Sequence, residues 1–165
     1  MEKTELYEAF QKGLTSVNGE CYKAKKADLA ATLTKIFQDK DTKDVAVVET
    51  PLLKEAGCVD ALKAAGIKVD TDHIRKNAPN DKGGVTEADY GIANLGSIVQ
   101  MKDDINCRIV ETVSDVYVGI IKLSKIQDNF DTMIDIMAAT KPFPKFAGVS
   151  RFYIDTNHHM NNGKY

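Results

Sequence analysis

The sequence predicts an α/β fold with a mostly parallel sheet. A buried strand at 45–48 is followed by a helix and then by a second strand that begins at residue 67. Because this order is a βαβ unit, these strands are expected to be parallel. Before the unit, apolar residues recur every three or four positions, which predicts two amphipathic helices. These residues are Leu6, Phe10, Leu14 and Val17, then Leu29, Leu33, Ile36 and Phe37.

The βαβ unit has clear boundary signals. The apolar, β-branched run at 45–48 is typical of a strand buried on both faces. Thr50 and Pro51 then predict the N-cap and the first position of a helix. Gly57 weakens the middle of this helix, and Gly66 is expected to end it.

The later elements alternate with turns. Polar and turn-forming residues from 73 to 84 predict a surface loop, with a mobile lid as the alternative. Apolar runs predict strands at 92–93, 98–99, 116–121 and 146–149, and a turn at 101–104 leads into a short helix through Val113. A helical stripe follows over 130–138. We expect one domain over 1–165, with N-terminal helices in 1–40, an α/β core over 45–156 and a flexible tail over 157–165.

Composition excludes several classes of function. The 165 residues include 22 basic and 24 acidic side chains, which gives a net charge of −2. This balance offers no electrostatic footprint for nucleic acid or for an anionic membrane. No apolar run approaches the ~20 residues of a membrane span, and the charged N-terminus does not resemble a signal peptide. A cytoplasmic location is therefore expected.

No metal or cofactor motif is present in the sequence. Cys21, Cys58 and Cys107 are far apart and lack C-x-x-C spacing, which argues against a disulfide framework, a zinc site or an iron–sulfur cluster. His158 and His159 are adjacent and are expected to belong to the unstructured tail. Phosphate-loop, dinucleotide and esterase motifs are also absent. We therefore expect no bound cofactor.

Candidate site residues gather in the segment 83–99. Asp89 lies two residues after Glu87, so the pair suits acid–base chemistry, or Asp89 caps a turn by accepting backbone hydrogen bonds. Asn94, Gly96 and Ser97 join two strand runs. They form a site that a small ligand approaches closely, or a plain hairpin turn.

Two arginines are candidates for holding an anion. Arg108 and the pair Ser150–Arg151 each follow a predicted turn or strand, and a guanidinium binds a carboxylate or phosphate with two parallel hydrogen bonds. The alternatives are an exposed arginine for Arg108 and a structural salt bridge for Arg151. The expectation is that these residues meet Asp89 and Ser97 at the carboxyl end of the sheet.

The segment 84–99 resembles the LUD domain of the lactate-utilisation protein C family. It reads G-V-T-E-A-D-Y-G-I-A-N-L-G-S-I-V, against the family pattern G-[VI]-T-x-A-D-Y-x-I-A-x-x-G-[ST]-[LIV]-V. Gly148–Arg151 resembles the family's G-P-S-R, with Val149 in place of proline. The resemblance implies a three-layer fold like that of the NagB/RpiA/CoA-transferase group. The family's last strand lies beyond Tyr165, so we expect it to be missing or supplied by a partner chain, which favours a homo-oligomer.

The resemblance also implies a function. It points to an accessory component of an iron–sulfur L-lactate oxidation system, which binds a small carboxylate while partner subunits hold the clusters. The alternatives are a stand-alone enzyme on a small carboxylate, phosphosugar or CoA ester, and a degenerate, non-catalytic relative. Asn94 and Leu95 stand where the family has Glu-Thr, and Thr156 replaces a glutamate. These departures leave the catalytic residues unassigned.

Overall fold

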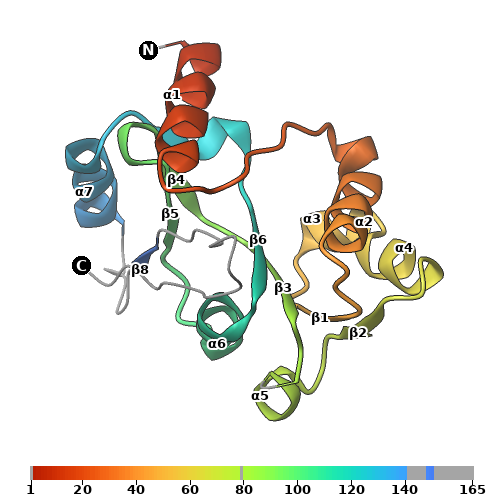
Figure 1. The fold of residues 1–165 in the computed structure, drawn as a ribbon. Coiled ribbons are helices and arrows are strands. Elements are labelled where there is room, and N and C mark those ends of the chain that lie inside the picture. The colour runs from red at the N-terminus through yellow and green to blue at the C-terminus, as the bar shows by residue number, and fades with distance from the viewer. Residues whose placement is uncertain (1, 79, 141–147, 151–165) are drawn as a thin grey trace. The chain divides into compact units, whose positions relative to one another are not determined.

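The computed structural model describes residues 2–78, 80–140 and 148–150, the last range by its backbone (Figure 1). The chain forms two compact units. Unit 1 comprises residues 1–21, 88–103 and 120–165, and unit 2 comprises 22–87 and 104–119. Among the described residues, no helix has the length and apolar character needed to cross a membrane. The predicted tail at 157–165 and its histidines lie outside the described residues.

Unit 2 is built on a four-stranded sheet with the order β2-β1-β3-β6. Val45 of β1 pairs in parallel with Val69 of β2 on one side and with Gly83 of β3 on the other. The predicted α/β fold with a mostly parallel sheet is therefore confirmed. The strands are β1 (Asp44–Val47), β2 (Lys68–Asp70), β3 (Gly83–Glu87) and β6 (Val116–Ile120). The helices are α2 (Leu29–Asp39), α3 (Pro51–Glu55), α4 (Cys58–Ala64), α5 (Ile74–Asn77) and α6 (Ile105–Val113), with a 3-10 turn η1 (Lys26–Asp28) before α2.

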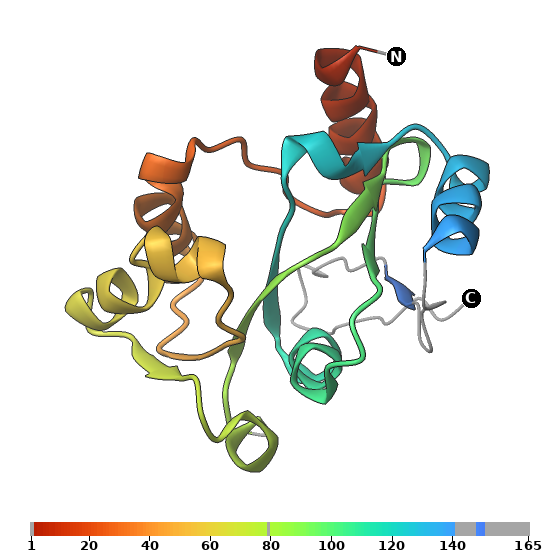
Figure 2. The same cartoon turned by 180° about the vertical axis from the view of Figure 1, so that it is seen from behind.

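Helices cover both faces of this sheet at β3 (Figure 2). Gly83 and Gly84 are successive in the strand, so side chains at these two positions would point to opposite faces of the sheet. A β-carbon on Gly83 would lie 2.8 Å from the Phe37 ring of α2. One on Gly84 would lie 2.5 Å from Val110 of α6 and 2.1 Å from the Ser114 hydroxyl. The missing side chains let both helix layers approach the strand closely, so unit 2 has three layers.

The helix predicted after β1 is two helices. The Thr50 hydroxyl accepts a hydrogen bond from the Leu53 N–H at 3.5 Å, and Pro51 is the first helical residue, both as predicted. Gly57, however, adopts a left-handed conformation with φ of 66°. This conformation breaks the helix into α3 and α4, whereas the sequence predicted one weakened helix. Gly66, with φ of 79°, follows α4 as expected.

Regular secondary structure occupies part of the segment 73–84, where the sequence predicted a loop. The segment contains the single-turn helix α5, and the buried strand β3 begins at Gly83. The Asp70 carboxylate accepts hydrogen bonds from the backbone N–H groups of Asp72 and His73 at 3.1 and 2.8 Å, and from the Asn77 side chain at 2.8 Å. The Asp70 carboxylate, which precedes this segment, therefore satisfies two backbone N–H groups just before the short helix and contacts its last residue.

Unit 1 has a second four-stranded sheet, with the order β7-β4-β5-β8. β4 and β5 form the predicted hairpin: Gly91 pairs antiparallel with Ile98, and the joining turn is 3-10 in form. β8 pairs antiparallel with β5, and β7, which the sequence did not predict, pairs in parallel with β4. The strands are β4 (Tyr90–Ile92), β5 (Ser97–Gln100), β7 (Ile126–Gln127) and β8 (Gly148–Ser150), and the helical elements are α1 (Lys3–Thr15), η2 (Ala93–Leu95), η3 (Leu123–Lys125) and α7 (Phe130–Ala139).

The helices α1 and α7 cover opposite faces of this second sheet. Ile98 and Val99 are successive in β5 and so point to opposite sides. Ile98 packs in the cluster around Phe10 of α1. Val99 packs in the cluster around Met133 of α7, which is fully buried. Both predicted helices are therefore confirmed, and each buries its apolar face against one side of the hairpin.

The backbones of α1 and η2 approach each other at two glycines. Gly96 has φ of 59°, and a β-carbon there would lie 2.0 Å from the backbone nitrogen of Leu14. A β-carbon on Gly13 would lie 2.6 Å from the backbone nitrogen of Gly96. Neither residue can carry a side chain without moving the helix away from the turn. The close approach at Gly96 is thus made by the protein's own backbone.

Replacing Gly96 by alanine should destabilise the protein far more than the same change at Gly57. Both residues have positive φ, which costs an alanine about 1–2 kcal/mol, but a β-carbon on Gly57 meets nothing within 4 Å. At Gly96 the clash with α1 should add about 1–3 kcal/mol. Urea unfolding followed by circular dichroism measures both variants. Equal losses of unfolding free energy in Gly96→Ala and Gly57→Ala would show that α1 does not pack closely against Gly96.

Candidate functional site

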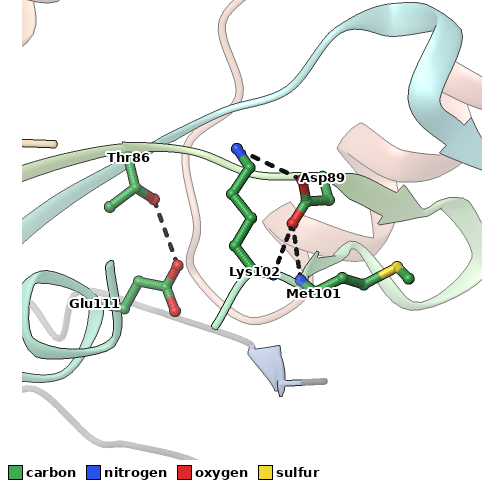
Figure 3. A network of polar contacts seen from close by, with 5 residues as sticks. All are labelled: Thr86, Asp89, Met101, Lys102 and Glu111. Carbon is green, nitrogen blue, oxygen red and sulfur yellow. Dashed lines mark hydrogen bonds and ion pairs between the residues drawn. The ribbon is translucent and has the colours of Figure 1, made fainter. Parts of the chain in front are cut away.

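Asp89 holds the end of the β4–β5 hairpin together in unit 1. One carboxylate oxygen, Oδ2, accepts hydrogen bonds from the backbone N–H groups of Met101 and Lys102 at 2.8 and 3.2 Å. The other, Oδ1, lies 3.5 Å from the Lys102 ammonium (Figure 3). Of the two roles considered for Asp89, the turn cap is the one seen. Hydrogen bonds to a charged acceptor stabilise a fold by about 1.5–3 kcal/mol each.

The turn residues lie together, as their sequence spacing requires. Asn94 is exposed on η2, and its backbone N–H donates to the Asp128 carbonyl at 3.1 Å. Ser97 starts β5, pairs with Ile92 and is 1% exposed. Asn94 therefore offers its amide to solvent, whereas Ser97 is enclosed in the sheet. Their role in binding stays a prediction.

The remaining candidates are distributed over both units. Ser150 pairs with Ile98 through β8, which brings its backbone next to Ser97 in unit 1. Arg108 is half-buried on α6 in unit 2. It lies one turn after the helix cap, in which the Asp104 carboxylate accepts a hydrogen bond from the Asn106 N–H at 2.8 Å. Arg151 lies outside the described residues. The expected meeting of all candidates at one rim stays a prediction.

A buried polar network in unit 2 was not predicted from the sequence. The hydroxyls of Thr86 on β3 and Tyr117 on β6 are 2.6 Å apart. Each also lies 3.4 Å from one carboxylate oxygen of Glu111 on α6, and Figure 3 shows Thr86 and Glu111 facing each other. Thr86 is fully buried and Glu111 is 5% exposed. The available signal was the position of Glu111 on the helix face that also carries the buried Cys107 and Val110.

The short distance between the two hydroxyls requires a hydrogen bond from one of them to the other. One hydroxyl must donate to the other, because two oxygens at 2.6 Å cannot both direct their protons elsewhere. The second hydroxyl then donates to Glu111. Burial, and then the Glu111 carboxylate, raises the pKa of the Tyr117 phenol well above its ordinary range. Tyr117 is therefore a neutral donor at physiological pH, and buried groups with shifted pKa values gather at functional sites.

The three cysteines lie on different parts of the chain. Cys21 is half-buried at the end of the first segment of unit 1, while Cys58 on α4 and Cys107 on α6 are buried in unit 2. Burial raises the pKa of the Cys21 and Cys58 thiols, which disfavours the reactive thiolate. Within the described residues, no three His, Cys, Asp or Glu side chains are grouped to hold a metal ion.

One further carboxylate in unit 2 is buried without a full set of partners. Asp81, just before β3, is 5% exposed, and its Oδ2 has no hydrogen-bond partner among the described residues. Burial, and then the carboxylate of Asp70, raises the pKa of Asp81; Asp44 adds to this, and Lys68 opposes it. Lys68 is itself 3.1 Å from Asp44. Asp81 thus places a carboxyl group where ionisation is disfavoured.

Removing the Tyr117 hydroxyl should destabilise unit 2. Tyr117→Phe leaves Thr86 and Glu111 without their shared partner, and we expect a loss of about 1–3 kcal/mol. Tyr90→Phe is the control, because its ring contact with Lys125 survives.

Because the folded state holds the Tyr117 phenol proton more tightly than the unfolded state does, wild-type stability should fall as pH rises above about 10, the unfolded pKa. Chemical unfolding at pH 7 to 11 should show this fall in wild type and a smaller one in Tyr117→Phe. The same fall in wild type and in Tyr117→Phe would contradict the attribution of this pH dependence to Tyr117.

Neutralising Asp81 should stabilise the protein at neutral pH. The raised pKa means that the folded state binds the proton more tightly than the unfolded state does. The contribution of Asp81 is therefore most favourable below about pH 3.9 and declines as pH rises through the folded pKa. Asp81→Asn should raise the thermal midpoint at pH 7, by an amount that shrinks as pH approaches 4. Asp72→Asn, on the exposed segment nearby, should have little effect at either pH. A lower midpoint for Asp81→Asn at pH 7 would refute the assignment.

Comparisons with known proteins agree with the fold described above. A solved structure titled as a DUF162 family protein from Deinococcus radiodurans is similar, with a TM-score of 0.70 and 12% sequence identity; the match covers 90% of this chain and 88% of that one. At this identity the likeness shows the fold. No curated protein matches. The LUD domain family matches residues 7–147, and that family is associated with lactate utilisation. The chain therefore belongs to the LUD domain family.

Proposed function

We propose that this chain is an accessory component of an iron–sulfur L-lactate oxidation system, which converts lactate to pyruvate. Membership of the LUD domain family over residues 7–147 is the observation that carries the proposal. The protein would act in the cytoplasm beside subunits that hold the clusters. The separate positions of Cys21, Cys58 and Cys107 support this division of labour, because a cluster needs several thiolates in one place.

The contribution of this chain would be to bind a small carboxylate. Lactate and pyruvate each carry one carboxylate group, which a guanidinium binds through two parallel hydrogen bonds. Arg108 on α6 is half-buried, so an ion pair there would be less screened than one made by an exposed arginine. Arg151 is the second candidate from the sequence. Asn94 has an exposed amide on the turn before β5, and Ser97, at the start of β5, is a further candidate from the sequence.

Two measurements test the proposal. Iron–sulfur subunits of an L-lactate oxidation system should co-purify with the tagged full-length chain. Lactate or pyruvate at a hundredfold excess over the dissociation constant should stabilise the isolated chain by about 2.7 kcal/mol, which appears as a rise of several degrees in thermal midpoint. Co-purification of no iron–sulfur protein would contradict the accessory role.

Arginine-to-lysine variants locate the carboxylate site. Arg108→Lys or Arg151→Lys should abolish much of the ligand-induced shift, since an ammonium cannot make the bidentate contact. Arg75→Lys, on the exposed surface of α5, is the matched control and should respond as wild type does. An equal shift in all three variants would show that these arginines do not bind the ligand. No shift in wild type at millimolar ligand would favour a degenerate relative that binds no carboxylate.

The second candidate function is a stand-alone enzyme. The observation that favours it is the Thr86–Tyr117–Glu111 network, in which two hydroxyls and a carboxylate form a buried chain that can move a proton. By analogy with the NagB/RpiA/CoA-transferase fold, its substrate would be a small carboxylate, phosphosugar or CoA ester. Turnover of lactate by the isolated chain, lost in Glu111→Gln, would favour this function over the accessory role.

A further inference from the structure

The outer side of α7 carries a row of exposed apolar side chains. Phe130 and Ile134 are 43% and 44% exposed, and Ala138, also exposed, continues the row at the same four-residue spacing. Residues four apart lie on one face of a helix. Single exposed apolar residues are ordinary on a protein surface, but a contiguous row of them marks an interaction site.

The row is not needed to hold α7 on its own sheet. Met133 is fully buried, and Ile136 and Met137 pack with it against Ile92 and Val99. The Asn129 side chain caps the helix by accepting from the Thr132 N–H at 2.9 Å. The attachment of α7 is therefore complete without Phe130 and Ile134, and the apolar face of the helix is wider than the part that the sheet covers.

Acidic side chains border this apolar row. Asp131 and Asp135 follow Phe130 and Ile134 by one residue each, and both are exposed. From residue 127 to 140 the charged residues are Asp128, Asp131 and Asp135, all of them acidic and exposed. A symmetric contact between two copies of this face would bring like charges together. A partner with basic side chains beside an apolar groove would meet complementary charge.

We propose that the outer face of α7, formed by Phe130, Asp131, Ile134, Asp135 and Ala138, docks into an apolar groove bordered by Lys or Arg side chains on a partner protein. The proposal rests on the accessory role argued above, in which the partner is an iron–sulfur subunit. The helix would bind by laying its apolar row into the groove, with the aspartates facing the basic border.

Binding of the full-length chain to a purified iron–sulfur subunit of an L-lactate oxidation system tests this surface. Phe130→Ser/Ile134→Ser should weaken the affinity at least tenfold. Asp131→Asn/Asp135→Asn should slow association and reduce its dependence on salt. Ile105→Ser/Val113→Ser is the matched control, because these two α6 residues are each 42% exposed, and it should bind as wild type does. Thermal midpoints of all variants report on folding.

The outcomes separate this proposal from the one on which it rests. If wild type does not bind the subunit, the accessory role fails and the assignment of this surface fails with it. If wild type binds and the α7 double variant binds equally well, only the surface assignment is overturned. A lowered thermal midpoint with unchanged affinity would show that the chain itself covers this face. Loss of a homodimer in the double variant would identify a second copy as the occupant. Each of these results contradicts the proposal.

Discussion

The close approach of a neighbouring segment to the glycines of segment 83–99 is the constraint on which both units depend. In unit 1, Gly96 lies against the α1 backbone, and no side chain fits between them. In unit 2, Gly84 leaves room for the Ser114 hydroxyl and Val110 of α6. Because each contact lies between a helix and the element on which it packs, these glycines determine how closely the helix approaches. That distance in turn determines how tightly the apolar side chains pack between them. Packing explains the glycines of the family motif at these positions.

The polar residues of the same segment find their hydrogen-bond partners within the protein itself. The Asp89 carboxylate accepts hydrogen bonds from the backbone N–H groups of Met101 and Lys102, the two residues that follow β5. Thr86 joins Tyr117 and Glu111 in a network within unit 2. Buried or half-buried polar groups need such partners, because an unsatisfied one costs about 1–3 kcal/mol. A motif that resembles a ligand loop in sequence can thus arise from requirements of folding.

Most elements could be predicted from the sequence, because strong local signals specify them: the Thr50–Pro51 start of α3, the apolar stripe of α7 and the hairpin turn at Gly96. Strand β3 could not, because Gly83 and Gly84 also signal a turn, and only the helices packed on both faces explain them. The polar contacts were harder to predict. The sequence allowed for a structural role of Asp89 as a hydrogen-bond acceptor, which the structure shows, whereas the Thr86 network depends on β3, α6 and β6 meeting in space. Sequence spacing does not encode that contact.

Amide hydrogen exchange in Asp89→Ala tests most directly whether this segment is structural. If Asp89 holds the hairpin, the variant should lose protection at the Met101 and Lys102 amides, while the affinity for lactate or pyruvate, measured on the same samples, stays unchanged. Asp135→Ala, an exposed carboxylate on α7, should leave both properties as in wild type. Retained protection at these two amides together with lost ligand affinity would show instead that Asp89 belongs to a binding site, and would contradict the account.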